Sequence, residues 1–398
     1  MKILYIAPNA AHQVNYIDAI YREGHEITIL TNDLTLHLRR LIVPNFESSY
    51  QKIKGPILKG IIKKLIFRLT LPIKLRDILR KFVDNSFNNY LNKLQHEKFD
   101  IVISYKDFGS EYIGRFQKKG CKWIIDEVNS HPDFSNYILN KEANKLGIYN
   151  KDLLILKENY TERIKTAYEK SDYILCSSEH VFKTIKKRIK NKQKIIINPY
   201  GCPFPINKKK KFHNKKINLI CISRMHFRKC IKYLLNVYDQ LEINFPNHFK
   251  LTIIGSCTPE KGFNIAEINS KVVFLGVQNK SHIKKELLNS DIFILPSLEE
   301  GQALVIGEAL AHGLPIISTP FSGAKDYILD KKLLKYALDN YALQIINPFD
   351  INKFYSAILN LSNKEIYKKA SNISIQIALQ NTWYFSGMEL VKKIESLA

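Results

Sequence analysis

The chain has 398 residues, which is too long for one compact core. Of these, 45% are hydrophobic and 11% are aromatic, a composition that excludes wholesale disorder. Its formal net charge of +24, from 61 Lys and Arg against 37 Asp and Glu, favours a polyanionic partner such as nucleic acid or an anionic membrane surface. An alternative explanation is biased coding, which makes a chain rich in Lys, Asn and Ile together. The excess of positive charge would then be solvated surface charge with no partner.

Neither a membrane span nor a metal site is indicated. No apolar run reaches the length of a transmembrane helix, and Pro8 and Asn9 interrupt the short apolar start that a secretory signal would need. The six cysteines are scattered without a CxxC pair or a ligand-like cluster, which argues against zinc and favours free thiols. We therefore expect a cytoplasmic protein.

The N-terminal residues have the pattern of an α/β domain. We predict a buried strand at Lys2–Pro8, a helix at Val14–Glu23 and a second strand at Glu26–Thr31. The loop between the first strand and the helix, Asn9–Gln13, lacks a glycine-rich fingerprint, so we expect it to form no more than a wall of a cleft.

A basic amphipathic stretch occupies residues 52–82. Its apolar residues recur at helical spacing, and its charged residues are almost all Lys or Arg. Such a helix can bind an anionic membrane surface, which would place the protein at the cytoplasmic face of the inner membrane. A core-facing helix with a solvated basic back has the same pattern. Aromatic residues are not interleaved with these cations, so we expect no nucleic acid partner.

Polar residues follow a strand predicted at residues 123–126. Open α/β sheets place ligands beyond the carboxyl ends of their strands, so His131 is a candidate to polarise an acceptor hydroxyl or to contact a donor sugar. A histidine that only forms hydrogen bonds within its own loop fits the sequence equally well.

Two cations leave the carboxyl end of a strand predicted at residues 217–222. Arg224 and Lys229 could together neutralise a diphosphate, Arg through its planar fork and Lys as a point charge. In a protein of this charge, two solvated surface cations are the alternative interpretation.

Residues 291–327 are predicted to form a strand–loop–helix–strand unit. The first strand is Ile292–Leu295, the loop is Leu298–Gln302, and the helix begins at about Ala303. Gly313 stands where a left-handed residue ends a helix, and Pro315–Thr319 is the next strand.

The loop of this unit opens onto a helix N-terminus, which is a favourable place for an anion. The amides of Gln302–Leu304 are a candidate cradle for a phosphate or diphosphate, and Gly301 would allow a ligand to approach the backbone. Glu300 and Glu308 bracket the cradle, and each carboxylate can accept two hydroxyls of a sugar. Alternatively, one glutamate compensates the helix dipole and the other is solvated.

The segment from Glu300 to Ile316 resembles the signature EG-(F)-G-L-x-x-x-E-A-(M/L)-A-x-G-x-P-(V/I) of retaining glycosyltransferases of family 4, which belong to glycosyltransferase group 1 and have the GT-B fold. The resemblance implies that Glu308 holds the nucleotide ribose and that Glu300 contacts the donor sugar. It also assigns the amides of Gln302, Ala303 and Leu304 to the sugar and diphosphate. Gln302 and Ala303 replace the usual aromatic residue and second glycine of the signature, which leaves the donor sugar open.

Two further matches extend the resemblance. Residues 223–230 resemble the motif G-R-x-x-x-x-K-G, which implies that Arg224 and Lys229 hold the leaving diphosphate. Val277 follows the phrase Phe274-Leu275-Gly276, after which family members hold the base with the main chain.

The resemblance implies two Rossmann-like domains that face each other across a donor cleft. We expect an N-terminal acceptor-side domain at residues 1–205, a nucleotide-sugar domain at 206–378, and a C-terminal helix at 379–398 that crosses back to the first domain.

The implied reaction is metal-independent and retains the anomeric configuration of the sugar. A UDP-sugar or GDP-sugar would be the substrate, without any cofactor, and a lipid-linked or saccharide acceptor would belong to bacterial cell-surface polysaccharide or glycolipid synthesis. Two alternatives remain: a GT-B sugar-nucleotide epimerase, and a non-catalytic module that binds a donor or a polyanion. Turnover of donor without acceptor would favour the epimerase, and nucleic acid retention at moderate salt would favour the polyanion-binding module.

Overall fold

The structure is a computed structural model. It describes residues 1–8, 11–33, 52–55, 87–145, 156, 158–206, 216–225, 227–256 and 271–397. The basic stretch predicted at 52–82 therefore lies outside the described residues, apart from 52–55, and so does part of the loop Asn9–Gln13.

The first domain is built on a parallel sheet with the strand order β3-β2-β1-β4-β5-β6-β7. Its strands are β1 (Lys2–Ile6), β2 (Glu26–Leu30), β3 (Lys52–Lys54), β4 (Ile101–Tyr105), β5 (Lys122–Glu127), β6 (Tyr173–Cys176) and β7 (Ile195–Ile197). Side chains of β1 alternate between two buried clusters, with Ile3 and Tyr5 on one face and Leu4 and Ile6 on the other. Burial on both faces explains the unbroken apolar runs of these strands.

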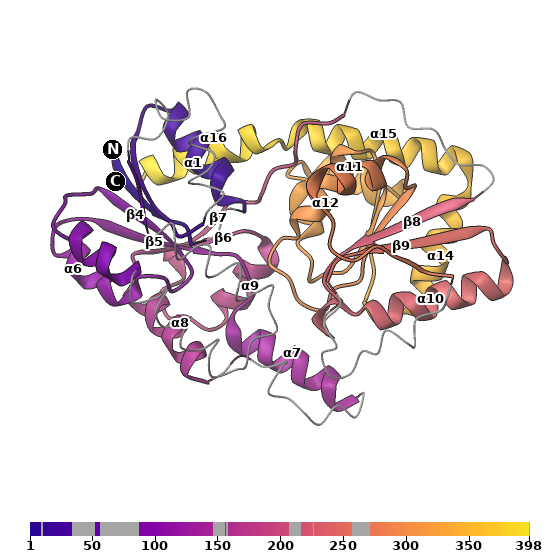
Figure 1. The fold of residues 1–398 in the computed structure, drawn as a ribbon, viewed down its shortest axis with the longest axis horizontal. Helices are drawn as coiled ribbons and strands as arrows, with labels where there is room; N and C mark the ends of the chain where they lie inside the picture. The colour runs from indigo at the N-terminus through magenta and orange to yellow at the C-terminus, as the bar shows by residue number, and fades with distance from the viewer. Residues whose placement is uncertain are drawn as a thin grey trace.

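Helices cover both faces of the first sheet, as Figure 1 shows. The helices of this domain are residues 87–94, α1 (Gln13–Arg22), α6 (Ile113–Gln117), α7 (Pro132–Lys145), α8 (Glu158–Lys170) and α9 (Glu179–Lys186), with short 3-10 turns η1 (Ser110–Tyr112) and η3 (Lys192–Lys194).

The second domain repeats this design with the strand order β10-β9-β8-β11-β12-β13. Its strands are β8 (Ile217–Ile222), β9 (Phe249–Ile254), β10 (Val273–Phe274), β11 (Ile292–Leu295), β12 (Ile316–Ser318) and β13 (Leu343–Ile345). Its helices are α10 (Ile231–Asn244), α11 (Lys280–Leu288), α12 (Leu304–Ala311), α13 (Lys331–Asp339), α14 (Ile351–Ser362) and α15 (Lys364–Gln380), with 3-10 turns η4 (Phe227–Lys229) and η6 (Ala324–Tyr327). The prediction of two Rossmann-like α/β domains is confirmed.

The chain crosses between the domains twice, and the two crossings are bonded together. The Cys202 N–H donates to the Asn381 carbonyl at 2.7 Å, and the Trp383 N–H donates to the Cys202 carbonyl at 3.0 Å. A Cβ on Gly201 would lie 2.4 Å from the Trp383 nitrogen, so this close approach requires glycine. After the second crossing, α16 (Trp383–Glu395) packs against α1 of the first domain (Figure 1).

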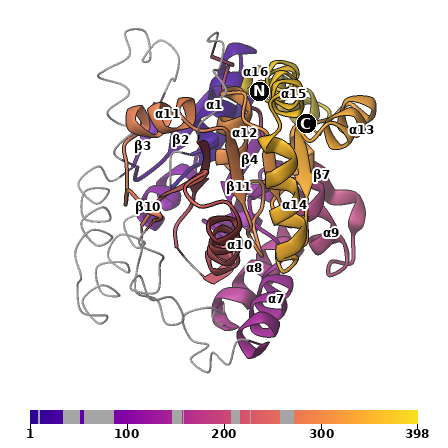
Figure 2. The same cartoon turned by 90° about the vertical axis from the view of Figure 1, so that its right-hand side faces the viewer.

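A second contact between the domains lies on the opposite side of this crossing. Helix α7 of the first domain lies beside the start of α10, as Figures 1 and 2 show. The Tyr233 hydroxyl donates to Glu142, and the Lys145 ammonium lies 4.6 Å from the centre of the Phe349 ring. The two domains are therefore held against each other at both ends of their interface.

One lysine in the basic run 183–194 differs from its neighbours. Most cations of this run are exposed, as expected for a solvated helix face, but Lys194 is buried. Its Nζ donates to the carbonyls of Tyr168, Glu169 and Ser171 at the C-terminal end of α8. The last carbonyls of a helix have no partner within the helix, and a cation there also complements the helix dipole.

Replacing Lys194 with Met should therefore lower the free energy of unfolding by about 1–3 kcal/mol, because buried carbonyls lose their donor. Urea unfolding followed by circular dichroism would measure the loss. Lys192→Met in the same turn is the matched control, since Lys192 is exposed. Equal stability of the two variants would contradict the capping role.

Candidate functional site

The predicted two-glutamate loop lies between β11 and α12 and faces the first domain. Glu300 in this loop is only 8% exposed. Its Oε1 accepts a hydrogen bond from Ser297 Oγ at 3.1 Å and forms an ion pair with Lys229 Nζ. Burial lowers the pKa of Lys229, and the neighbouring cation Arg228 lowers it further. The structure thus brings together Glu300 and Lys229, two of the residues that the sequence predicts for the donor.

Sequence reasoning missed the two residues that stand directly before this pair. Glu299 is 1% exposed, and its Oε2 accepts from Arg228 Nη1 at 2.7 Å. Arg228 also lies 3.8 Å from Glu300 Oε2. Burial alone would raise the pKa of Glu299, but Arg228 and Ser130 hold it below its usual range. The doubled pattern in the sequence, two adjacent acids and two adjacent cations, was the signal that could have found both residues.

Arg224 and Val277 lie at the carboxyl ends of strands in the second sheet. Arg224 follows β8 and is exposed, and its charge helps to lower the pKa of Lys229. Val277 follows β10 and is 75% exposed. Both residues are at the sheet edge where open α/β folds bind ligands.

Glu308 is half-buried on α12, about one turn into the helix. Burial raises the pKa of its carboxyl, and Lys280 at the start of α11 opposes this effect. Among the described residues, its carboxylate has neither a hydrogen-bond donor nor an ion-pair partner within contact distance. The Glu308 carboxylate is thus available to the hydroxyls of a ligand. The effect of Lys280 on its pKa shows that the segment after β10 lies near Glu308.

The predicted amide cradle is only partly available. The Ala303 N–H donates to the Ser322 carbonyl at 3.0 Å, so this amide cannot hold a phosphate without breaking that bond. Leu304 is the first residue of α12, where the amide has no acceptor within the helix. The Gln302 side chain does not face a ligand, because its Oε1 accepts from the Tyr200 N–H at 2.6 Å. Gln302 therefore ties the loop to the crossing between the domains.

Gly301 approaches protein backbone where we expected it to approach a ligand. A Cβ at this position would lie 1.5 Å from the Val128 carbonyl oxygen of the first domain. The Gly301 carbonyl also accepts from Ser178 Oγ at 2.8 Å. The glycine is required because the two-glutamate loop touches the loop after β5.

His131 lies in that loop after β5, at the start of α7. It is 2% exposed, and its Nδ1 accepts from the Asp133 N–H at 3.1 Å. Burial lowers the pKa of His131 to about 4, so the ring is neutral at pH 7 and carries its proton on Nε2. These contacts are those of a histidine that forms hydrogen bonds within its own loop, which was the alternative that the sequence left open. Its neighbour Ser130, through Glu299, joins the loop to the second domain.

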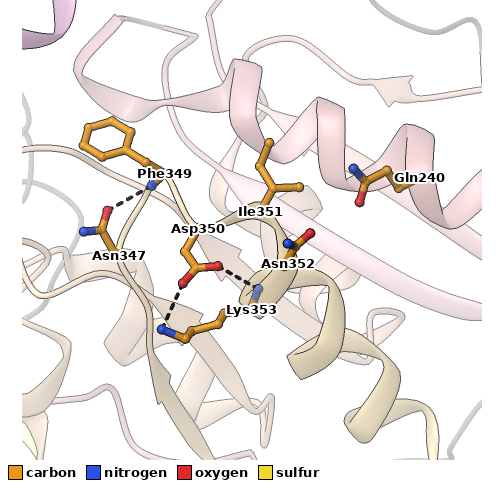
Figure 3. A pocket seen from close by; sticks show the side chains of 7 residues that line it. All are labelled: Gln240, Asn347, Phe349, Asp350, Ile351, Asn352 and Lys353. Atoms are coloured by element: carbon orange, nitrogen blue, oxygen red, sulfur yellow. Dashed lines mark hydrogen bonds and ion pairs between the residues drawn. The ribbon is translucent and has the colours of Figure 1, made fainter.

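A pocket of about 590 Å³ lies elsewhere, between α10 and the start of α14 (Figure 3). It is lined by Gln240, Asn347, Phe349, Asp350, Ile351, Asn352 and Lys353. Asp350 accepts from the Lys353 N–H at 3.1 Å and pairs with its Nζ at 2.9 Å, so these charges satisfy each other (Figure 3). None of the predicted site residues lines this pocket.

Comparison with known proteins places the site in a defined domain. Residues 216–364 match the family model described as glycosyl transferases group 1. An uncharacterized glycosyltransferase of Methanocaldococcus jannaschii is 23% identical over 327 residues, which cover 78% of this chain and 87% of that protein. The second sheet, with its two-glutamate loop, lies within the matched residues 216–364.

Solved structures identify the fold. HepE of Anabaena, in complex with UDP and glucose, superposes with a TM-score of 0.63 at 13% identity, covering 100% of this chain and 99% of that one. WaaG, a glycosyltransferase involved in lipopolysaccharide biosynthesis, superposes with a TM-score of 0.61 at 15% identity, covering 98% and 99%. The protein has the GT-B fold, and the matched domain and the relative together support a glycosyltransferase. Within the described residues, no helix has the length and apolarity to cross a bilayer.

One contact between the domains predicts a dependence of stability on pH. Asp326 of the second domain accepts from the Glu179 N–H of the first at 2.7 Å, and burial raises the pKa of Asp326 to about 6. Because this pKa exceeds that of the unfolded chain, the acid contributes stability below about pH 4 that is lost as pH rises through 6. The free energy of unfolding of Asp326→Asn, minus that of wild type, should therefore increase as pH is raised from 4.5 to 7.5. Urea unfolding at each pH would measure both values.

Asp350→Asn is the control that should show no such trend. The hydrogen bond from Lys353 lowers the pKa of Asp350 below its ordinary value of 3.8, so its contribution to stability is lost only below about pH 4, and the cost of its replacement should stay constant between pH 4.5 and 7.5. A pH-independent effect of Asp326→Asn would contradict the burial of an ionisable carboxyl.

Proposed function

We propose that this protein is a retaining glycosyltransferase that moves a sugar from a nucleotide-sugar to an acceptor hydroxyl. The observation that carries the proposal is the cluster between the domains, where Glu300 pairs with Lys229 at the carboxyl ends of β8 and β11. A glycosyl transferases group 1 domain encloses this cluster, and the GT-B fold sets a second domain opposite it.

The cations of the cluster would stabilise the leaving group. When the bond between the anomeric carbon and the diphosphate breaks, negative charge develops on the diphosphate oxygens. Arg224 and Lys229 would neutralise that charge, and the Leu304 amide at the start of α12 would add a helix dipole. Preorganised charges of this kind are usually the largest catalytic contribution, so the proposal needs no metal ion.

The two glutamates would hold the donor at its two ends. Glu308 would accept the ribose hydroxyls, since its carboxylate has no competing donor within the described residues. Glu300 would contact the donor sugar once the diphosphate attracts Lys229 away from it. His131 carries its proton on Nε2 and is 2% exposed, so it would donate to the acceptor or the sugar only after the loop after β5 moves. The main chain at Val277 would contact the base.

We take a UDP-sugar or a GDP-sugar as donor. The complex of HepE with UDP and glucose supports the first choice. The likeness to WaaG, together with a basic amphipathic stretch in the sequence, supports a lipid-linked or saccharide acceptor in cell-surface polysaccharide or glycolipid synthesis.

Nucleotide binding tests the proposal directly. A thermal-shift screen with UDP, GDP, ADP and CMP should show one that stabilises the protein, by roughly 2.7 kcal/mol at a hundred times its Kd. Glu308→Ala should abolish most of the shift while leaving the ligand-free melting temperature within a few degrees. The wild-type affinity should also fall as pH is lowered through the raised pKa of Glu308. A shift that survives Glu308→Ala would remove the ribose role.

Membrane docking has a separate test. Replacing Lys59, Lys63, Lys64 and Arg68 with Gln should release the protein from vesicles of phosphatidylserine and phosphatidylcholine, since each cation near an anionic surface contributes about 1 kcal/mol. The matched control replaces Lys186, Lys187, Lys190 and Lys192, which are exposed in the described part of the first domain. Wild-type protein that does not sediment with such vesicles would contradict the membrane proposal, and so would equal release of the two variants.

A further inference from the structure

Glu299 is a buried carboxylate that contacts both domains. Its Oε1 accepts from Ser130 Oγ at 2.7 Å and from the Ser130 N–H at 3.3 Å, in the loop after β5 of the first domain. Its Oε2 accepts from Arg228 Nη1 at 2.7 Å, in η4 of the second domain. With 1% of its surface exposed, the charge is stabilised by these two partners and not by water.

This link differs in kind from two other hydrogen bonds between the domains. Ser178 to Gly301 and Glu179 to Asp326 each join a side chain to a neutral backbone group. The Glu299 link instead ends on Arg228, which is the neighbour of Lys229 in the chain and lies 3.8 Å from Glu300. The arrangement thus attaches the first domain to the group of charges that would receive the donor diphosphate.

We propose that Glu299 is a positioning residue that couples donor binding to closure of the two domains, by holding Arg228 to Ser130. The proposal rests on the proposed function only for the identity of the donor. Once a diphosphate draws Lys229 away from Glu300, Arg228 would remain as the cation beside both glutamates, and Glu299 would transmit its position to the loop that carries Ser130 and His131. The acceptor side would therefore be ordered when the donor site is filled.

Glu299→Gln separates the two halves of this link. The Ser130 N–H and the Arg228 guanidinium can only donate, and an amide has only one oxygen, so Gln must leave one of these two donors without its acceptor. Glu242→Gln is the matched control. Glu242 is also a buried glutamate, 7% exposed, but it pairs with Lys271 at 2.8 Å inside the second domain.

The first readout uses no ligand. Dyes on Lys118→Cys in the first domain and Lys335→Cys in the second would report the distance between domains by energy transfer. A Cys257→Ser background suits this labelling, because the other five cysteines are buried. Glu299→Gln should lower the transfer efficiency relative to wild type, and Glu242→Gln should not. Addition of UDP should raise the efficiency of wild type more than that of Glu299→Gln.

The second readout divides the kinetic effect. Glu299→Gln should lower kcat by roughly tenfold to a hundredfold, because the acceptor side is misplaced, whereas the KM for the donor should change by less than about threefold. Adding Arg228→Gln to Glu299→Gln should cause little further loss, since both changes break the same link.

Unchanged energy transfer in ligand-free Glu299→Gln would overturn the proposal, and so would a loss in kcat that Glu242→Gln reproduces. The ligand-free measurement contains no donor. It therefore tests the link from Ser130 through Glu299 to Arg228 whatever group the protein transfers. Failure of the wild-type protein to bind UDP would count against the proposed donor alone.

Discussion

The burial of two adjacent carboxylates where the domains meet is the constraint on which the site depends. Glu299 and Glu300 lose nearly all of their hydration, and a buried charge without a partner costs several kcal/mol. Arg228 and Lys229 supply the compensating charges from the second domain, and Ser130 supplies two donors from the first. The cluster is balanced, with two acids and two bases, so a diphosphate that enters it must exchange partners with groups already paired.

The architecture brings these charges together from segments far apart in the chain. Both sheets are parallel, so the loops after β5, β8 and β11 leave the carboxyl ends of their strands. The two domains turn these edges toward each other, and the paired crossings at Cys202 and Thr382 fix one end of the interface. Gln302 then ties the two-glutamate loop to Tyr200 within the first crossing. Domain arrangement and site geometry are thus determined by the same few hydrogen bonds.

The unit from 291 to 327 could be predicted because its signals are local. β11 has the predicted bounds Ile292–Leu295, and α12 begins at Leu304, one residue after the predicted start. Gly313 has a φ of +69°, which is the left-handed conformation predicted for the residue that ends the helix. An apolar run, a glycine and a proline determine these features through the backbone, without reference to the rest of the chain.

The contacts that a local pattern cannot encode were missed. Glu299 bonds to a serine 169 residues away, and Gln302 bonds to a residue 102 positions away. For the same reason the sequence could not show that the Ala303 amide is occupied, that Gly301 faces Val128, or that Lys194 alone among its basic neighbours is buried. Each of these features depends on which segment packs against which, and that is decided by the fold as a whole.

The central claim is that the cluster around Glu300 and Lys229, with Glu308, is the donor site. Hydrogen–deuterium exchange with and without UDP or GDP tests this claim most directly, because it locates the bound nucleotide along the chain. The account predicts slower exchange in residues 223–230 and 297–308 together. Protection confined to the pocket at residues 347–353, or none in either segment at saturating nucleotide, would contradict it.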